Sequence, residues 1–474
     1  MRKRQEPETV ELQVDSAGFE GVCVSRYDNK VVFTKYTVPG DRISANLYKN
    51  KKKFYEAKVN SIIEKSPDRI EPKCKHFGVC GGCSWQSMSY EKQLYWKSTN
   101  VKDVFQRIGK VEVPEFREII GAENQFGYRN KMEFSFGASR WLTDDEVSSE
   151  IEIERKDYAF GLHIPGRFDK ILDIERCEIQ SDYANQILSS IKEFTYKHNY
   201  ITYNARTHDG FLRGLIIRYS AKENSYMTIL MTSTPKNEHE KDLITWFGSE
   251  FADNFPKITN LIHAINDSVN SVTIKESLIL KGEGFFYEDI LGVNFRVSPF
   301  SFFQTNSFQL NRFINEIIST AEPKKNMVVW DLYCGTGSIS LPIASKVQKV
   351  IGVELVESSV EDARNNALIN SINNAEFYSA DLHNKRIPEL LQSLDKPDLV
   401  IIDPPRSGMN PNLIGHLLNI APPDLVYVSC NPATQARDCA LLAEKYDVIS
   451  VQPVDMFPHT YHIESIAKLR LRED

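Results

Sequence analysis

The sequence lacks the long apolar runs that insertion into a membrane requires. No stretch of the 474 residues approaches the roughly 18 consecutive apolar residues of a transmembrane helix. The first ten residues, MRKRQEPETV, are basic but polar, so they lack the apolar core of a signal peptide. We therefore expect a cytoplasmic protein with no membrane partner. Its eight cysteines should then be thiols, metal ligands or catalysts rather than disulfides.

The chain also lacks the positive net charge of a protein that coats nucleic acid. It contains 57 Lys and Arg against 64 Asp and Glu, a formal net charge of −7. The first 66 residues differ, with 13 Lys and Arg against 9 Asp and Glu. A basic segment on an acidic body favours a local surface that faces phosphates, although a solvated basic loop has the same composition.

The length predicts two to four domains. Residues 8–64 contain short alternating apolar runs separated by turns, which is typical of a small OB-like β-barrel. Within them, LYKNKKKFYEAKV interleaves five lysines with three aromatic residues, a pattern that suits RNA because cations meet phosphates and rings stack on bases. A hairpin with a charged loop is the structural alternative. We assign the barrel to residues 1–66.

The texture of the chain changes near residue 300. Residues 67–300 mix strands with helices, which predicts a central α+β domain. Residues 301–474 contain the apolar runs VVWDLYCG, KVIGVEL, DLVIIDPP and DLVYVSC, separated by helical stretches. Such strands are typical of a parallel sheet covered on both faces, so we predict a doubly wound, Rossmann-like α/β domain. Its ligands should bind beyond the carboxyl ends of the strands.

A glycine loop follows the first of these strands, in DLYCGTGSIS. Gly335 and Gly337 would let the backbone approach a ligand closely, and Glu354 ends the next strand, where a carboxylate can accept hydrogen bonds from ribose hydroxyls. The last glycine of a dinucleotide fingerprint is missing, because position 340 is serine. This favours a nucleoside ligand without a pyrophosphate, such as S-adenosylmethionine.

Two more acidic residues follow the third and fourth strands. Asp381 stands in FYSADL, where it could meet an adenine, and Asp403 stands in DLVIIDPPRSG. Each alone would be an ordinary residue of a strand end. Three acids at successive strand ends, beside a glycine loop, favour a methyltransferase-like domain.

Five motifs, in this order, resemble the RNA uridine-5-methyltransferase family: FFQTNSFQ, DLYCGTGSIS, IIDPPRSGMNP, VYVSCNPAT and VDMFPHTYHIES. The N-terminal barrel is similar to the TRAM module of many members, and YRNKMEFSFG and DIERCEI resemble segments of the family's central domain. The resemblance covers nearly the whole chain. It implies a class I methyltransferase domain that uses S-adenosylmethionine to methylate transfer or ribosomal RNA.

The chemistry explains why a cysteine stands where the strand DLVYVSC ends. Carbon 5 of uracil becomes nucleophilic only after a thiolate adds to carbon 6, and the hydrogen on carbon 5 must later leave to a base. Cys430 fits the nucleophile. The resemblance implies Glu464 of FPHTYHIES as the base, and we interpret the nearby His459 and His462 as hydrogen-bonded structural residues.

The resemblance also implies the residues that bind the methyl donor, which are Gln304, Tyr333, Glu354, Asp381 and Asp403. Gln304 is a polar residue in an aromatic stretch, which agrees with a positioned hydrogen-bonding group. For Arg406 of DPPRSG, contact with phosphate or base and a structural salt bridge are equal alternatives.

Three cysteines cluster around glycines, as Cys74-x5-Cys80-Gly-Gly-Cys83. Three thiolates need a fourth ligand, and four cysteines suit either zinc or an iron–sulfur cluster. The resemblance implies Cys177 as the distant ligand and favours a 4Fe–4S cluster. We expect the cluster to hold the joint between the barrel and the central domain, or to shape the RNA surface. No role is assigned to Cys23, Cys334 and Cys439, although Cys334 is expected to pack.

These observations predict a monomeric enzyme that methylates carbon 5 of a uridine, flipped out of structured RNA to reach Cys430. The cluster and the barrel favour 23S ribosomal RNA over tRNA. Two alternatives remain: an exocyclic-amine methyltransferase, which needs no thiol, and a non-catalytic RNA-binding or redox-sensing iron–sulfur protein.

Overall fold

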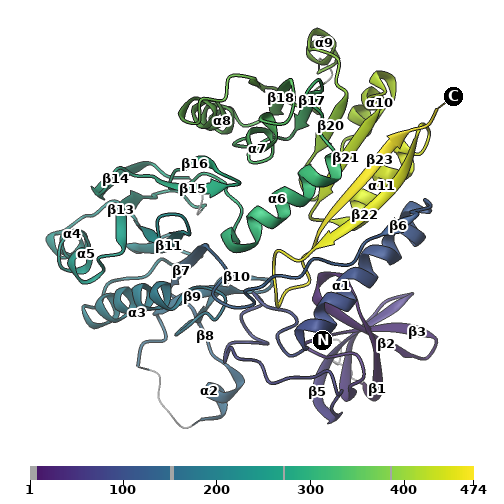
Figure 1. The fold of residues 1–474 in the computed structure, drawn as a ribbon. Coiled ribbons are helices and arrows are strands. Elements are labelled where there is room, and N and C mark those ends of the chain that lie inside the picture. Colours follow the sequence, from purple (N-terminus) through teal and green to yellow (C-terminus); the bar gives the residue numbers. More distant parts are fainter. Residues whose placement is uncertain (1–7, 150–153, 271–272, 385–386, 474) are drawn as a thin grey trace.

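A closed barrel and two large sheets organise the chain (Figure 1). The computed structural model describes residues 8–149, 154–270, 273–384 and 387–473. Within these ranges no helix combines the length and the apolar character needed to cross a membrane.

The N-terminal strands close into the predicted barrel, in the order β1-β2-β3-β5-β4. Alternation along β1 puts Val10, Leu12 and Val14 inside, where Trp85 and Met88 from beyond the barrel join them. A short 3₁₀ turn (Phe19–Gly21) follows β1. The strands are β1 (Glu8–Ala17), β2 (Val22–Tyr27), β3 (Lys30–Lys35), β4 (Arg42–Asn50) and β5 (Phe54–Glu64).

The central sheet has eight mostly antiparallel strands, drawn in blue and teal in Figure 1. In sheet order they are β14 (Glu276–Lys281), β13 (Ile258–Ile265), β12 (Ser225–Thr232), β11 (Leu212–Ser220), β7 (Lys131–Gly137), β9 (Ala159–Ile164), β10 (Arg167–Asp173) and β8 (Arg140–Trp141). Helix α3 (Asp182–Lys197) packs Ile187, Leu188 and Ile191 on this sheet, as their spacing on one helical face dictates. Three shorter helices and a hairpin complete this part: α2 (Asp144–Ser148), α4 (Glu238–Gly248), α5 (Glu250–Asn254), and β15 (Phe286–Ile290) with β16 (Val293–Val297).

The C-terminal sheet has the order β19-β18-β17-β20-β21-β23-β22-β6. Its strands are β17 (Val328–Leu332), β18 (Lys349–Glu354), β19 (Ala375–Ser379), β20 (Leu399–Ile402), β21 (Asp424–Ser429), β22 (Tyr446–Val454) and β23 (Glu464–Leu471), with β6 (Glu115–Phe116) at the edge. The strands β17 to β21 are parallel, and β23 runs antiparallel to β21. The order reverses at β17, between β18 and β20, which makes a crevice for ligands at the carboxyl ends of these strands. The predicted class I architecture is confirmed.

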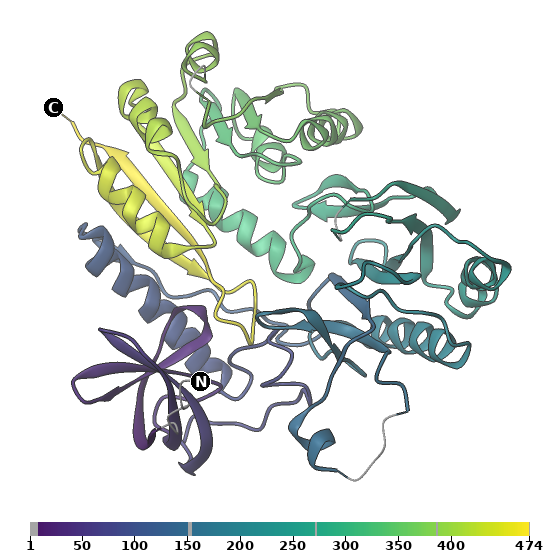
Figure 2. The ribbon, with the colours of Figure 1, turned by 180° about the vertical axis from the view of Figure 1, so that it is seen from behind.

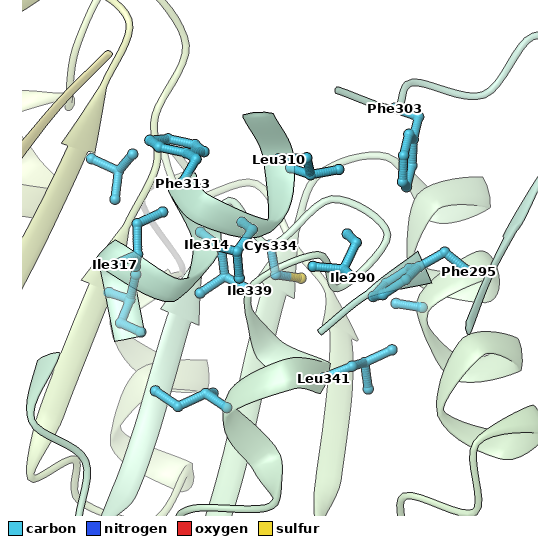
Figure 3. Close-up of a cluster of buried hydrophobic side chains, with 14 of the residues drawn as sticks. Ile290, Phe295, Phe303, Leu310, Phe313, Ile314, Ile317, Cys334, Ile339 and Leu341 are labelled. Atoms are coloured by element: carbon cyan, nitrogen blue, oxygen red, sulfur yellow. The ribbon is translucent and has the colours of Figure 1, made fainter. Parts of the chain in front are cut away.

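Helices α6 to α11 accompany this sheet, and α6 joins it to the central part. In Figure 3, Phe313, Ile314 and Ile317 of α6 face Ile339 and Cys334. Cys334 is 4% exposed within this core, which confirms the expected packing role of its thiol. The helices are α6 (Ser307–Ala321), α7 (Ser340–Ala344), α8 (Glu357–Ile369), α9 (Ile387–Ser393), α10 (Pro411–Ile420) and α11 (Pro432–Leu442).

One segment from before the central sheet belongs in space with the C-terminal sheet. Helix α1 (Tyr90–Val104) and the π-helical turn after it (Phe105–Gly109) pack on α11, and β6 pairs in parallel with β22. Figures 1 and 2 show this blue helix lying beside the yellow strands. The chain therefore enters the C-terminal sheet before it builds the central one.

Candidate active site

Strand register brings Cys430 and Glu464 together. Strand β21 ends at Ser429, which pairs with Ser465 of the antiparallel strand β23. Cys430 directly follows Ser429 and Glu464 directly precedes Ser465, so the register brings them near each other, and the charge of this carboxyl adds to burial in raising the pKa of the thiol. The thiol is partly buried and Glu464 is 6% exposed. A nucleophile and a candidate base therefore face each other where the sheet opens to the crevice.

The motif Ser-Cys-Asn-Pro is a strand-to-helix turn. Asn431 caps α11, because its side-chain oxygen accepts a hydrogen bond from the amide of Ala433 at 3.2 Å. Pro432 follows as the first helical residue, a position where its missing N–H costs nothing. The cap and the proline fix the backbone on both sides of the thiol, so Cys430 has a defined place at the edge of the sheet.

Burial and neighbouring acids make both groups of this pair hard to ionise. Burial, followed by the charges of Glu464 and Asp403, raises the pKa of Cys430 to about 11. Burial and the charge of Asp403 hold the pKa of Glu464 well above its usual value. A carboxylate with a raised pKa is a stronger base, which is what removal of a carbon-bound hydrogen requires.

Arg406 is the cation of this group. Its charge and its hydrogen bond to the thiol lower the pKa of Cys430, and its charge lowers that of Glu464. Its Nη2 lies 3.4 Å from Nδ1 of His462, whose burial lowers the pKa to about 4. Asn431 donates to the backbone oxygen of Arg406 at 2.9 Å, which ties this loop to the turn that carries Cys430.

The donor side of the crevice is built from loops after β17, β18 and β19. The carboxylate of Glu354 accepts hydrogen bonds from the amides of Gly335 at 3.1 Å and Val356 at 2.9 Å, so it also shapes the glycine loop. Tyr333 has a φ of 67°, and its hydroxyl lies 3.3 Å from Nε2 of His383. The His383 amide donates to Asp381 at 2.8 Å. His383, which the sequence analysis did not single out, therefore links two of the predicted donor-binding residues.

The structure also explains the serine that replaces the last glycine of the fingerprint. The Ser340 hydroxyl donates to the carboxylate of Asp331, which is 1% exposed at the end of β17. Burial raises the pKa of Asp331 to about 7, and the charge of Asp331 contributes to the similar rise for Asp403. Asp331 is a buried acid of the crevice that the sequence analysis passed over. Its signal was a polar residue inside an apolar strand.

The loop that carries Gln304 is held from the central sheet. Arg218 of β11 is 3% exposed, and burial lowers its pKa to about 10. Its guanidinium donates to the backbone oxygens of Ser298 at 2.8 Å, Pro299 at 3.1 Å and Ser301 at 2.9 Å. Asn130 donates from its side chain to the backbone oxygen of Gln304 at 2.9 Å. The sequence analysis singled out Gln304 but neither Arg218 nor Asn130, which hold the backbone of its loop.

A cavity of about 660 Å³ runs from Cys430 to the cysteine-rich joint. This volume is ordinary for a pocket that encloses a small organic group. Phe302, whose side chain is 72% exposed, and Arg406 line it with Cys430. The cavity is lined further by Arg129, Lys131, Phe303, Thr305, Phe457, Thr460 and His462. Cations and aromatic rings around a thiol suit a nucleotide.

The four predicted cluster cysteines line the other end of the same cavity. The amide of Gly82 donates to Sγ of Cys80 at 3.4 Å, and a Cβ on Gly81 would come within 2.2 Å of Pro165. Cysteine ligands whose sulfur atoms accept hydrogen bonds from backbone amides are the residue types that suit an iron–sulfur cluster. Yet no group of three or more His, Cys, Asp or Glu side chains in the described ranges stands so that it could hold a metal ion. The ligand set stays a prediction.

The two histidines near Glu464 differ in their surroundings. His459 is 2% exposed and stacks on Phe126 with ring centroids 4.3 Å apart, and Gln93 accepts a hydrogen bond from its amide at 2.8 Å. This agrees with the structural interpretation. His462 lines the cavity and contacts Arg406, so it belongs to the site's surroundings.

Comparisons with known proteins agree with this geometry. The family described as "tRNA (Uracil-5-)-methyltransferase" matches residues 268–471. An "Uncharacterized RNA methyltransferase" of Bacteroides thetaiotaomicron is 41% identical over 454 residues, covering 96% of this chain and 99% of its own length. A similarly described protein of Chlorobaculum tepidum is 38% identical over 441 residues, covering 92% and 90%.

A solved structure extends the similarity to the whole fold. The crystal structure of Pyrococcus abyssi tRNA (uracil-54, C5)-methyltransferase in complex with S-adenosyl-L-homocysteine covers 97% of this chain and 100% of its own. Its TM-score is 0.73 at 26% sequence identity. The similarity therefore spans the barrel, the central sheet and the C-terminal sheet.

Proposed function

We propose, from the premise that this chain belongs to the RNA uracil-5-methyltransferase family, that it methylates carbon 5 of one uridine in a structured RNA. The methyl donor of this family is S-adenosylmethionine, and RNA is its substrate. The observation that carries the proposal is that the Ser429–Ser465 pair brings the next residues, Cys430 and Glu464, near each other, so that the charge of the carboxyl acts on the thiol.

In the proposed reaction the sulfur of Cys430 bonds to carbon 6 of the flipped uracil. Carbon 5 then takes the methyl group from the sulfonium of the donor, which leaves as S-adenosylhomocysteine. Glu464 takes the hydrogen of carbon 5 as a proton, the carbon 6–sulfur bond breaks, and the electron pair returns to the sulfur. One nucleophile and one base complete the cycle, and the electrons move in pairs throughout.

The thiol has to lose its proton for this addition. With a pKa near 11, it is protonated at neutral pH in the free protein. We assign to Arg406 the stabilisation of the thiolate as it forms, because its guanidinium contacts the thiol and favours the charged form. Phosphate or base contact by Arg406 belongs to the same proposal, since its side chain is exposed in the cavity.

We assign donor binding to Gln304, Tyr333, Glu354, Asp381 and Asp403. Supporting this, Tyr333, Glu354, Asp381 and Asp403 follow or end successive strands at the switch point of the sheet. In the structure Glu354 already uses one oxygen for Gly335 and the other for Val356, and a carboxylate oxygen accepts more than one hydrogen bond.

The test of this reaction is Glu464→Gln. Blocking proton removal should leave methylated RNA attached to Cys430, as a band shifted on a denaturing gel. The donor should bind this variant as it binds the wild type. A folded, donor-saturated variant that gives no shifted band, or that turns over at the wild-type rate, would remove Glu464 from the role of base.

For the RNA, we take 23S ribosomal RNA as the first candidate, because a cysteine-rich joint and a basic barrel accompany the catalytic sheet. Transfer RNA is the second candidate, because tRNA stands in the descriptions of the matched family and of the Pyrococcus abyssi structure. Mapping 5-methyluridine in total RNA from cells with and without this protein decides between them.

We assign RNA binding outside the cavity to the barrel. Its similarity to a TRAM module stays a prediction, as do the domain boundaries 1–66, 67–300 and 301–474 and the monomeric state. Tyr48 is 62% exposed beside the lysines of β4 and β5. Lys49, however, pairs with Glu56 at 2.5 Å, which leaves Lys51, Lys52 and Lys53 as the phosphate contacts we expect.

We also propose that Cys74, Cys80, Cys83 and Cys177 hold a 4Fe–4S cluster. Their gathering at one cavity and the amide aimed at Cys80 support this. Such a cluster would supply a rigid link between the barrel, the joint and the central sheet. Iron and sulfide analysis of anaerobically purified protein tests it, and zinc in their place would correct it.

A further inference from the structure

The loop of residues 455–463, between β22 and β23, leads directly to Glu464. We call it the base loop. It is the yellow loop that leaves the strands and reaches the point where the barrel, α1 and the central sheet meet (Figures 1 and 2). Val454 pairs with Glu464 at the start of the loop, so the backbone around Asp455 sets the position of the base.

A buried lysine of α1 holds the beginning of the base loop. Nζ of Lys97 lies 2.7 Å from Oδ1 of Asp455, with the two side chains 1% and 0% exposed. The same ammonium donates to the backbone oxygen of Phe457 at 3.0 Å. The amide of Phe457 donates in turn to Oδ1 of Asp455 at 3.0 Å. One cation therefore fixes both a side chain and the backbone two residues later.

Tyr90, the first residue of α1, hydrogen-bonds to the other carboxylate oxygen of Asp455. Its hydroxyl donates to Oδ2 of Asp455 at 2.8 Å and accepts from the amide of Ala122 at 2.7 Å. The amide of Asp455 donates to the backbone oxygen of Ile120 at 2.8 Å. The carboxylate of Asp455 is thus hydrogen-bonded on both oxygens.

The rest of the base loop is held from several other parts of the chain. The side chain of Gln93 in α1 accepts a hydrogen bond from the amide of His459. The backbone oxygen of His459 accepts hydrogen bonds from the amides of Ser84 at 2.9 Å and Trp85 at 3.0 Å. Asn306 donates to the backbone oxygen of Met456 at 2.9 Å, and Tyr128 to that of Pro458 at 3.1 Å. The base loop is therefore hydrogen-bonded along its length to residues of α1, the cysteine-rich joint and the central part of the chain.

Stability alone is a poor reason for this arrangement. A buried ion pair contributes little net stability compared with apolar residues of the same shape, because both charges lose their hydration. It does impose a defined geometry on the groups around it. Here the imposed geometry is that of the backbone beside the base.

We propose that Lys97, through its buried ion pair with Asp455, is the positioning residue that aims Glu464 at the hydrogen of carbon 5. The inference rests on the proposed function, because it requires Glu464 to be the base. A displacement of about 1 Å in a reacting group can slow a step about 100-fold. Loosening Asp455 should therefore slow proton removal and leave the earlier addition and methyl transfer intact.

The test is Lys97→Met in the full-length protein, with the unmodified transcript that mapping identifies, made with either hydrogen or deuterium on carbon 5 of uridine. We expect kcat to fall about 10- to 100-fold, with the KM for the donor unchanged. The deuterium isotope effect on kcat should rise above that of the wild type. Methylated RNA attached to Cys430 should accumulate on a denaturing gel.

Lys468→Met is the matched control. Lys468 is a 4% exposed lysine of β23, and it pairs with Glu322 rather than with any residue of the base loop. It should lose stability while keeping the wild-type isotope effect. An adduct in this control would show that any buried lysine of the sheet has the same effect, and would overturn the inference.

Tyr90→Phe covers the case in which Lys97→Met does not fold, since it keeps the ion pair and removes two hydrogen bonds, one to Asp455 and one from the amide of Ala122. It should change the isotope effect in the same direction by a smaller amount. A folded variant with a wild-type isotope effect and no adduct overturns the role of Lys97. Absence of 5-methyluridine with wild-type protein, or of an adduct with Glu464→Gln, refutes the proposed function instead.

Discussion

The two sides of the candidate site are positioned by different physical means. Cys430 and Glu464 owe their meeting to backbone pairing between neighbouring strands, which fixes every residue along the ladder at once. Gln304 and Tyr333 lie on loops, which side-chain hydrogen bonds hold one at a time. The difference teaches that the donor side should weaken when one clamp of its loops is removed, while on the catalytic side the ladder should keep Cys430 in place and only the base loop should depend on a clamp, that of Lys97.

The largest effect should come from the catalytic side itself. Cys430→Ala removes the nucleophile and leaves the ladder between β21 and β23 intact. Methylation should fall to background, and calorimetry should give the wild-type affinity for S-adenosylmethionine. Retained methylation would favour an exocyclic-amine methyltransferase, which needs no thiol, and absence of donor binding in the wild type would favour the non-catalytic iron–sulfur protein.

A smaller effect should follow from removing the clamp on the donor side. Arg218→Met removes the hydrogen bonds to the backbone oxygens of Ser298, Pro299 and Ser301, of which that of Ser298 keeps a hydrogen bond from the Ser301 hydroxyl, and it should loosen the loop that carries Gln304. Each buried group left without a partner costs about 1–3 kcal/mol, so we expect a loss of about 3 kcal/mol in urea unfolding.

The same variant should bind the donor more weakly and react more slowly. Half-buried Arg213, on the same strand, donates to the backbone oxygen of Ser268 at 2.6 Å and has no hydrogen bond to the Gln304 loop among the described residues. It offers the control Arg213→Met, which should change neither donor affinity nor rate. If Arg218→Met binds the donor as the wild type does, the loop of Gln304 does not depend on a single side chain. The proposed difference between the two sides of the site would then be wrong.

The last effect concerns the buried acid of the donor side, and it changes stability with pH rather than activity. Burial raises the pKa of Asp331 from 3.8 to about 7, so the folded protein keeps a proton that the unfolded chain loses. Stability should therefore fall as pH rises from about 4 to about 7, and Asp331→Asn should not share this fall. The difference amounts at most to about 4 kcal/mol, at 1.36 kcal/mol per pH unit.

Urea unfolding of both proteins across this range measures it. Subtracting the two curves cancels the titrating groups that Asp331 does not influence and leaves the titration of Asp331 together with its effect on Asp403. Equal curves would mean that Asp331 is ionised in the folded state, and that its contact with Ser340 stabilises the charged form.

Much of the fold could be predicted because its signals are local. Alternating runs in residues 8–64 indicated the barrel, and apolar runs separated by helical stretches indicated the doubly wound sheet. The spacing of the apolar residues along 91–108 is also typical of a helix, although the last of them, Ile108, is 48% exposed. The docking of α1 on α11 was not visible, because that contact joins distant parts of the chain.

The site was predictable in its chemistry and less so in its supports. Motifs pointed to Cys430 and Glu464. Arg218 and Lys97 donate to backbone oxygens, and because every residue has one, such contacts leave no motif in the sequence. Two signals did exist. Arg218 interrupts the apolar run LIIRYS, and Lys97 lies between Leu94 and Val101 on the apolar face of its helix. A charge on an apolar face implies a buried partner.

The packing of residues 90–120 against the C-terminal sheet matters for any attempt to produce the C-terminal part alone. Gln452 of β22 donates to the backbone of Glu118, 334 positions away, and α11 rests on α1. A fragment starting at residue 301 would present an unpaired strand edge and an uncovered apolar helix face, both prone to self-association. Splitting this molecule therefore calls for two pieces mixed together, one of them carrying residues 90–120.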